Sequence, residues 1–143
     1  YSDYGSNYGD IKGETYVGGC AGFLSTAYDL KISALHNSGK VEGISNVGGV
    51  AGNVSCTGSK KKGTISMCTN TGDVTGDENI GGLFGTLNIY TSSTMTLTSN
   101  STSGIITGKT NVGQLYGLGS GNGSGAITDD GTNACTGEVV IGQ

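Results

Sequence analysis

Proline and tryptophan are both absent from this chain of 143 residues, which also has only two phenylalanines and one histidine. Without proline, its 29 glycines cannot belong to a collagen-like triple helix, which needs a proline-rich Gly-X-Y repeat. Charged residues are scarce, at 13%, whereas valine, isoleucine and threonine are plentiful, which argues against intrinsic disorder. Hydrophobic residues make up only 34% of the chain, so a conventional globular core would be thin. We therefore expect a single domain of short β-strands and tight turns.

Excess basic charge and long apolar segments are missing as well, and each absence excludes a class of partner. The sequence pI of about 4.6 argues against nucleic-acid binding, which needs a basic face. The only basic run, Lys60-Lys61-Lys62, lies between glycines and is interpreted as a solvated loop tip. No stretch of about 18 apolar residues exists, so we expect no membrane insertion. The chain starts at Tyr1 without a signal peptide, so we expect a processed mature protein or a segment of a longer one.

What the sequence does contain is an internal repeat. A motif of the form Val/Ile-Gly-Gly/Gln-x-x-Gly occurs four times, with a truncated fifth copy, at 17–22, 47–52, 80–85, 112–117 and 141–143. Successive copies begin 30, 33, 32 and 29 residues apart. A second element, Asn-x-Gly-x-Val-x-Gly, precedes each copy at a fixed offset and begins at Asn7, Asn37 and Asn70. The fourth copy of this element lacks the asparagine. The fifth copy keeps Gly137, and in our alignment Cys135 takes its apolar position.

Each repeat is interpreted as one coil of a β-solenoid. Val41 alternates with Lys40 and Glu42, which indicates a short strand with one inward side chain. We expect Gly39 and Gly43 to supply turns at positive φ on either side of it. The residues after the Gly-Gly pair are expected to form an inward column, Cys20, Val50, Leu83 and Leu115. The residues that follow this column in the chain vary in size and are expected to face outward or into a looser layer. They are Ala51, Phe84 and Tyr116.

The repeat predicts the architecture of the whole chain. We expect an all-β solenoid of about four to five coils, with roughly 30 to 33 residues and about three strands in each coil. Residues 7–143 would form the single repeat domain, preceded by a tyrosine-rich arm at residues 1–6. The glycine-rich run 117–125 is interpreted as a flexible loop.

These motifs resemble the GLUG-motif repeat family, whose signature is Gly-Leu-any-Gly. Gly82-Leu83-Phe84-Gly85 fits the signature as it stands. The copies at 19–22 and 49–52 depart at the leucine, and the copy at 114–117 departs at the first glycine. The resemblance covers roughly residues 7–143 and implies secretion or display on a bacterial surface. Some family members are accessory regions of metallopeptidases, but the zinc motif His-Glu-x-x-His is absent here.

The four cysteines indicate disulfides if the chain is exported. Cys56 and Cys68 flank the lysine run and could staple it as a loop. Cys20 and Cys135 lie in the first and last coils, on the order of 19 Å apart at the spacing of parallel strands, which is too far for a disulfide. These two cysteines would then be free or intermolecular, unless Cys20 pairs with Cys56 in the next coil instead.

No residue pattern indicates catalysis, a cofactor or a metal. His36 is the only histidine and is interpreted as a turn residue. Asp73, Asp77 and the pair Asp129-Asp130 do not match calcium-loop spacing and are interpreted as solvated turns. The chain is therefore not expected to be an enzyme.

Three glycosylation sequons occur, at Asn53, Asn100 and Asn122, and the last two are expected in loops. The segment 94–98 alternates threonine with apolar residues, as in ice-binding arrays. Because no other coil repeats that pattern in sequence, we expect no flat threonine array.

The ends of the repeat show no legible cap, which leads to a hypothesis about function. The chain would be a structural subunit of an extracellular filament or surface assembly, polymerising head to tail with copies of itself. Tyr1, Tyr4 and Tyr8 are candidate interface residues. The alternative is an adhesin or stalk module that binds a host protein or glycan through the variable segments 23–35, 53–67, 86–99 and 118–130.

Overall fold

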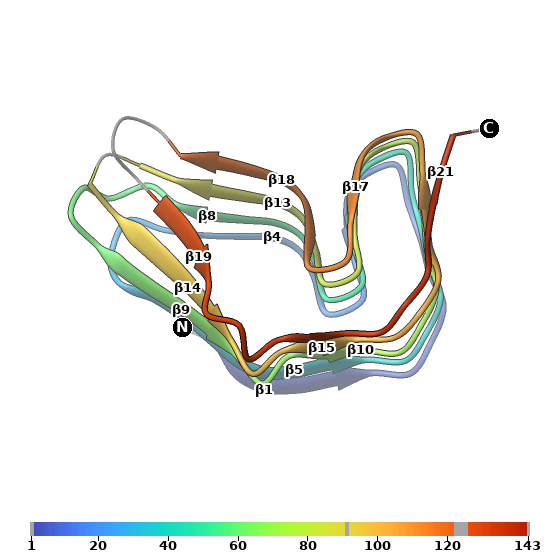
Figure 1. The fold of residues 1–143 in the computed structure, drawn as a ribbon, viewed down its shortest axis with the longest axis horizontal. Helices are drawn as coiled ribbons and strands as arrows, with labels where there is room; N and C mark the ends of the chain where they lie inside the picture. The colour runs from blue at the N-terminus through green and yellow to red at the C-terminus, as the bar shows by residue number, and fades with distance from the viewer. Residues whose placement is uncertain (1, 91, 122–125, 143) are drawn as a thin grey trace.

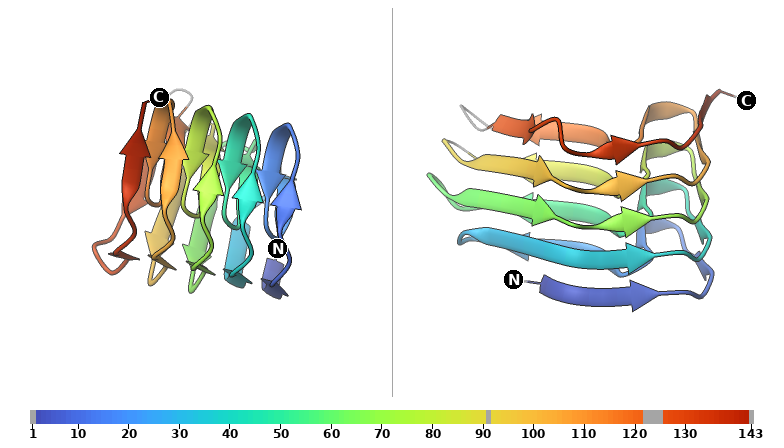
Figure 2. Two further views of the ribbon diagram at one scale, coloured as in Figure 1. Left: turned by 90° about the vertical axis from the view of Figure 1, so that its right-hand side faces the viewer. Right: turned by 60° about the horizontal axis from the view of Figure 1, so that its bottom comes forward.

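The computed structural model describes residues 2–90, 92–121 and 126–142, and these residues form an all-β solenoid of about four turns (Figure 1). Each turn takes roughly 32 residues, as the sequence repeat predicts. Every strand pair is parallel and joins segments 30 to 33 residues apart, so successive coils stack directly on one another (Figure 2). The predicted repeat architecture is therefore confirmed.

The strands belong to four sheets. Sheet A comprises β1 (Ser2–Asn7), β5 (Leu30–Asn37), β9 (Lys62–Ser66), β10 (Thr69–Asn70), β14 (Thr94–Thr98), β15 (Ser101–Thr102), β19 (Ala126–Asp129) and β20 (Ala134–Cys135). Sheet B comprises β2 (Ile11–Lys12), β6 (Val41–Glu42), β11 (Val74–Thr75), β16 (Ile106–Gly108) and β21 (Val139–Ile141). Sheet C comprises β3 (Thr15–Gly18), β7 (Ser45–Gly48), β12 (Glu78–Gly81) and β17 (Thr110–Gly113). Sheet D comprises β4 (Ala21–Thr26), β8 (Ala51–Cys56), β13 (Phe84–Ile89) and β18 (Tyr116–Gly121).

One coil passes through the sheets in the order A, B, C, D. Coils 1 to 4 begin at β1, β5, β9 and β14, and coil 5 contributes β19, β20 and β21. The predicted three strands per coil were therefore too few. Residues 2–6, expected as a separate arm, belong to β1 and pair with β5. Residues 117–121 of the glycine-rich run form part of β18, and residues 122–125 lie outside the described residues.

The cross-section has two lobes, because the corner between sheets C and D descends to the inner face of sheet A (Figure 1). Sheets A and D enclose the larger apolar core, which includes Ile32, Val54, Ile65, Phe84 and Leu87. Sheets B and C enclose a second core, composed of Val17, Val41, Val47, Val74, Ile80 and Ile106. Two narrow cores account for a chain with so few large apolar residues.

The corner between sheets C and D requires the first and third glycines of each motif. A Cβ added to Gly48 would lie within 3.0 Å of the backbone of Ala51 and Gly85. A Cβ added to Gly52 would lie equally close to the backbone of Tyr16 and Val17 in sheet C. These glycines therefore allow close backbone approach at the corner, as expected for a glycine in a strand.

The second glycine faces a column of asparagine side chains on sheet A. Asn7 donates to Asn37 Oδ1 at 2.8 Å, and Asn37 donates to Asn70 Oδ1 at 2.8 Å. The same amides also reach the backbone two residues on, since Asn37 donates to Gly39 O at 2.8 Å. Asn37 and Asn70 are only 2% and 1% exposed. A Cβ added to Gly19 or Gly49 would overlap the amide of Asn37 or Asn70, so each asparagine needs a bare glycine opposite it.

Coil 5 replaces this pair by a different one. Cys135 pairs with Thr102 in the asparagine column, so its alignment with the apolar position was wrong, and Val139 occupies that position. The position opposite this cysteine, where the repeat would place a glycine, is occupied by Gln114. The Gln114 Nε2 donates to Gly137 O at 2.5 Å. That carbonyl lies two residues after Cys135, as Gly39 lies two residues after Asn37. The glutamine amide thus supplies the hydrogen bond that an asparagine at 135 would have made.

Two expectations about conformation and facing were wrong. Gly39 and Gly43 do not have positive φ, whereas nine described non-glycine residues do, among them the stacked Asn46, Asn79 and Asn111. Asparagine tolerates this region because its amide bonds locally, and Asn79 and Asn111 each donate to the previous asparagine, at 3.1 and 2.9 Å. Ala51 and Phe84, expected to face outward or a looser layer, are fully buried, because the corner leads them straight into sheet D above the larger core.

Substituting Gly49 by alanine tests the role of the second glycine. We expect Gly49→Ala to lower the free energy of unfolding by about 3 kcal/mol or more, because the new methyl group overlaps backbone and the Asn70 amide. The matched control is Gly63→Ala, whose Cβ would meet Leu30 Cβ at an ordinary 3.4 Å and should change stability by less than about 1 kcal/mol. Equal losses for the two variants in urea unfolding would contradict this role.

Candidate functional site

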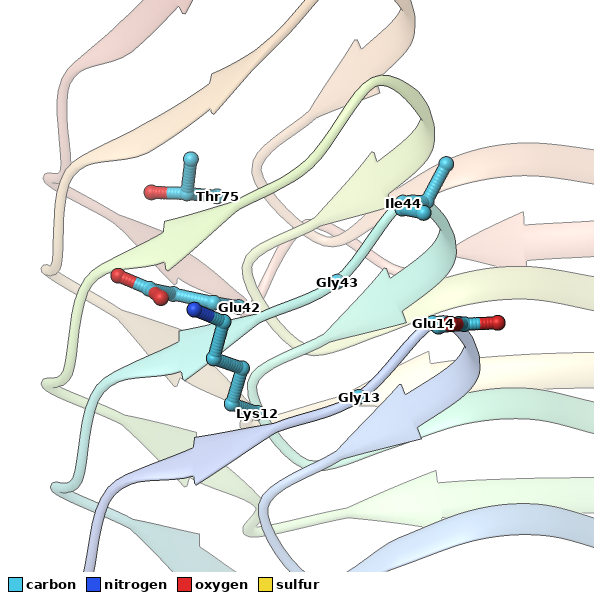
Figure 3. A pocket seen from close by; sticks show the side chains of 7 residues that line it. All are labelled: Lys12, Gly13, Glu14, Glu42, Gly43, Ile44 and Thr75. Atoms are coloured by element: carbon cyan, nitrogen blue, oxygen red, sulfur yellow. The ribbon is translucent and has the colours of Figure 1, made fainter.

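A shallow groove lies on the outer surface of coils 1 to 3, where each chain segment turns from sheet B into sheet C (Figure 3). It is lined by Lys12, Gly13, Glu14, Glu42, Gly43, Ile44 and Thr75. Its floor is glycine because Val17 and Val47 of the smaller core lie directly beneath: a Cβ on Gly43 would be 2.7 Å from Val47 Cγ2 and 2.8 Å from Val17 Cγ2. Packing of the core, rather than a ligand, thus accounts for the groove.

The groove carries mixed charge and no nucleophile with an adjacent base. Lys12 and Glu42 project from neighbouring strands of sheet B, and Glu14 and Ile44 project from the turns (Figure 3). Lys40 Nζ lies 3.2 Å from Glu42 Oε1, and both side chains are exposed. Exposed pairs of this kind contribute little to stability or affinity. In the part of the chain that the structure describes, no group of three or more His, Cys, Asp or Glu side chains could hold a metal ion.

The histidine is a strand residue rather than a turn residue. His36 lies in β5, half-buried, and its Nδ1 is 2.6 Å from Thr69 Oγ1 in the next coil. Its neighbours across the ladder are Ser6 and Thr69. Within the described part of the chain, the imidazole has a hydroxyl as its side-chain hydrogen-bond partner and no carboxylate that would orient it as in a catalytic triad.

The aspartates interpreted as turn residues are engaged in local hydrogen bonds. Asp129 Oδ1 accepts from Gly131 N at 2.9 Å and from Asn133 Nδ2 at 2.7 Å. Hydrogen bonds from Thr132 hold the pKa of the Asp130 carboxyl below its usual value. Asp73 Oδ1 accepts from Ile105 N of the next coil, and Asp77 forms an exposed ion pair with Lys109 at 3.2 Å. These contacts stabilise turns and coil stacking.

All four cysteines are free thiols. Cys56, in sheet D, donates to Tyr28 O at 3.5 Å, and Cys68, which follows β9 in sheet A, donates to Ser66 O at 3.5 Å. The staple between Cys56 and Cys68 is therefore not formed in this structure, where the two residues belong to different walls of the solenoid. Cys20 and Cys135 are half-buried in coils 1 and 5, so their intermolecular pairing stays a prediction.

The two described sequons lie in strands or against the core. Asn100 is only 1% exposed, and its Nδ2 donates to Ile65 O at 3.0 Å and to Asn133 Oδ1 at 2.9 Å. Asn53 is 5% exposed and accepts hydrogen bonds from Ser55 and Asn88. A glycan on Asn100 would have to displace these bonds, so the folded chain does not present this nitrogen. Asn122 lies outside the described residues.

The tyrosines proposed as interface residues lie in coil 1. Tyr8 is 80% exposed beyond the end of β1. Tyr1 and the side chain of Tyr4 lie outside the described residues. The structure adds further aromatic residues to the same coil, since Tyr28 is 74% exposed and Tyr16 and Phe23 meet edge to face with ring centroids 5.2 Å apart. Sequence reasoning missed these because they lie apart along the chain, Tyr16 in β3, Phe23 in β4 and Tyr28 after β4.

No family model, curated protein or solved structure matches this chain. The resemblance to GLUG-motif repeats thus stays a prediction from the sequence. Among the described residues, no helix is of a length and hydropathy that would let it cross a membrane.

The buried thiol of Cys68 predicts a pH dependence of stability. Burial raises the pKa of this thiol from 9.0 to about 11, and the Cys20 thiol adds to the effect while a hydrogen bond to Leu35 opposes it. The folded state thus holds the proton more tightly than the unfolded state. The resulting stability is fully present below pH 9 and is lost as the pH rises through about 11, by about 2 to 3 kcal/mol.

Chemical denaturation at pH 8 to 11 checks this expectation, with Cys68→Ala as the comparison. The variant should be less stable at pH 8, because it leaves a cavity, yet should lose less stability on going to pH 11. Parallel curves for the two proteins would show that Cys68 does not titrate as described.

Proposed function

We propose that this chain is a structural subunit of an extracellular filament or surface assembly, in which copies stack head to tail through the open ends of the solenoid. The observation that carries the proposal is the edge of each sheet. Among the described strands, sheets B, C and D end in β2, β3 and β4 on one side and in β21, β17 and β18 on the other. Such unpaired edges are templates for pairing with another chain.

The parallel ladder supplies complementary edges at the two ends. Ile11 N donates to Lys40 O at 2.8 Å and Gly13 N donates to Glu42 O at 3.0 Å, so both amides face coil 2. Amides alternate in direction along a strand, and the intervening Lys12 N–H therefore faces the open side. Sheets A and B extend one coil beyond sheets C and D at the other end (Figure 2), so β21 is the first strand that the β2 of a neighbour would meet.

The aromatic residues of coil 1 support the same contact. Tyr8, Phe23 and Tyr28 are at least half exposed at this end of the solenoid. Tyrosine and phenylalanine are enriched where proteins meet. The extracellular location rests on the resemblance to GLUG-repeat surface proteins, and the partner proposed is a second copy of the chain.

An adhesin or stalk module is the second candidate. The exposed aromatic residues of coil 1 favour it, because aromatic rings also stack on sugars and on protein surfaces. Under this alternative, the monomer would bind a host protein or glycan without first polymerising.

Replacing Lys12 by proline tests the filament directly. Lys12→Pro removes an amide that faces outward and leaves the bonds of Ile11 and Gly13 in place, and proline is tolerated at such edge positions. We expect the unmodified chain to form filaments at high concentration, as seen by negative-stain electron microscopy, and Lys12→Pro to remain as short rods. Lys12→Ala, which keeps the amide and loses the same charge, should assemble like the unmodified chain.

Two outcomes would contradict the filament proposal. The first is a chain that sediments as a monomer at every concentration. The second is assembly of Lys12→Pro that matches that of Lys12→Ala. A monomer that binds an isolated host glycan or protein would favour the adhesin module instead.

A further inference from the structure

A set of hydroxyl side chains lies on the outer face of the first half of sheet A, on strands β9, β14 and β19. We name it the hydroxyl panel, and its members are Thr64, Ser66, Thr94, Thr96, Thr98 and Thr128. The register places Thr64, Thr96 and Thr128 in one column across three coils, and Ser66 and Thr98 in a second. The sequence had indicated no such array, because only coil 4 carries the full alternation. The ladder shows that coils 3 and 5 extend it.

Thr96 is the centre of the panel. Thr64 and Thr128 flank it on the neighbouring coils, and Thr94 and Thr98 flank it along its own strand. Hydroxyls of successive coils thus repeat at about 4.8 Å, and those along a strand repeat at about 6.7 Å, the distance of two strand residues. The panel is therefore a small rectangular lattice of hydroxyl and methyl groups.

Most panel hydroxyls differ from other polar columns of this solenoid in having no side-chain hydrogen-bond partner among the described residues, Thr98 being the exception. On the outer face of sheet D, Ser55 Oγ donates to Asn53 Oδ1 at 3.3 Å and Asn88 Nδ2 donates to Asn53 Oδ1 at 3.1 Å. In the panel, Thr98 contacts Thr132 Oγ1 at 3.2 Å. No side-chain hydrogen bond within the described residues engages the hydroxyls of Thr64, Ser66, Thr94, Thr96 or Thr128.

The backbone beneath the panel is held rigidly. Ile65, Met95 and Leu97 alternate with the panel residues and are fully buried in the larger core. Both neighbours of β14 pair with it in register over four or five residues. The backbone that carries the panel is therefore fixed in position before any ligand arrives, which lowers the entropic cost of binding.

We propose that the hydroxyl panel binds ice, through an ordered layer of water anchored by the threonine lattice. The two repeats of the panel are close to the repeats of oxygen atoms on the prism face of hexagonal ice. Discrete partners fit the panel poorly, because it has no aromatic or arginine side chain to serve as an anchor for a protein or glycan. Its charged neighbours lie at its margins: Lys31 of coil 2 pairs with Thr64, and Lys62 of coil 3 pairs with Thr94. Asp130 of coil 5 interacts with the Thr98 hydroxyl.

The test is ice recrystallisation and thermal hysteresis with the whole chain and two threonine-to-lysine variants. Thr96→Lys places a long charged side chain at the centre of the panel and should abolish ice shaping. Thr107→Lys is the matched control: Thr107 is a half-buried threonine of the same coil on the outer face of sheet B, in register with Thr75 and Val140. This control should shape ice like the unmodified chain. Circular dichroism and the thermal midpoint check that both variants fold.

If Thr96→Lys fails to fold, Thr128→Lys takes its place, since Thr128 is exposed. The proposal is overturned if the unmodified chain leaves ice growth unchanged, or if panel and control variants behave alike. Retention of the chain on crystalline cellulose or chitin without an effect on ice would also overturn it. None of these results depends on whether the chain forms filaments.

Discussion

The contact between a bare glycine and a buried asparagine amide is the constraint on which the rest of this solenoid depends. Gly19 and Gly49 lie against the amides of Asn37 and Asn70, with no room for a Cβ. Asn37 donates to the Asn70 amide, and each of the two amides also donates to the carbonyl two residues on, that of Gly39 or Gly72. A lost bond here would leave buried polar groups unpaired, at a cost of about 1 to 3 kcal/mol each. The contact draws the corner between sheets C and D onto sheet A, and the two-lobed cross-section follows from it.

The same contact explains the places where the repeat departs from its own pattern. Where coil 4 has Gln114 in place of the second glycine, coil 5 has Cys135 in place of the asparagine, and the glutamine takes over the bond to Gly137. Coil 4 has Thr102 in place of the asparagine and keeps Gly82 opposite it. The buried Thr102 Oγ1 has no partner within the described residues. Each departure thus involves residues of two coils, which is why single motifs look degenerate.

Much of the fold could be predicted from sequence because the period is explicit. The inward columns at Val41 and Val50 and the offset between coils follow from spacing alone. The role of the glycines could not be derived in this way, since glycine signals both positive φ and close approach, and at Gly39 and Gly43 only the second applies. The burial of Phe84 was also missed, because it depends on how tightly the corner between sheets C and D closes. The threonine column was missed because Thr64, Thr96 and Thr128 align only after coil lengths of 32 residues are taken into account.

The most direct test of the glycine–asparagine contact is a double-mutant cycle on Gln114→Gly and Cys135→Asn, measured by urea unfolding. Cys135→Asn alone places an amide against Gln114, and Gln114→Gly alone loses the bond to Gly137, so each single variant should be destabilised. Together they rebuild the pair seen at Gly49 and Asn70, and the double variant should be more stable than the sum of the single effects by at least about 1 kcal/mol. Additivity within about 0.3 kcal/mol would contradict the account, because it would mean that the two positions do not depend on each other.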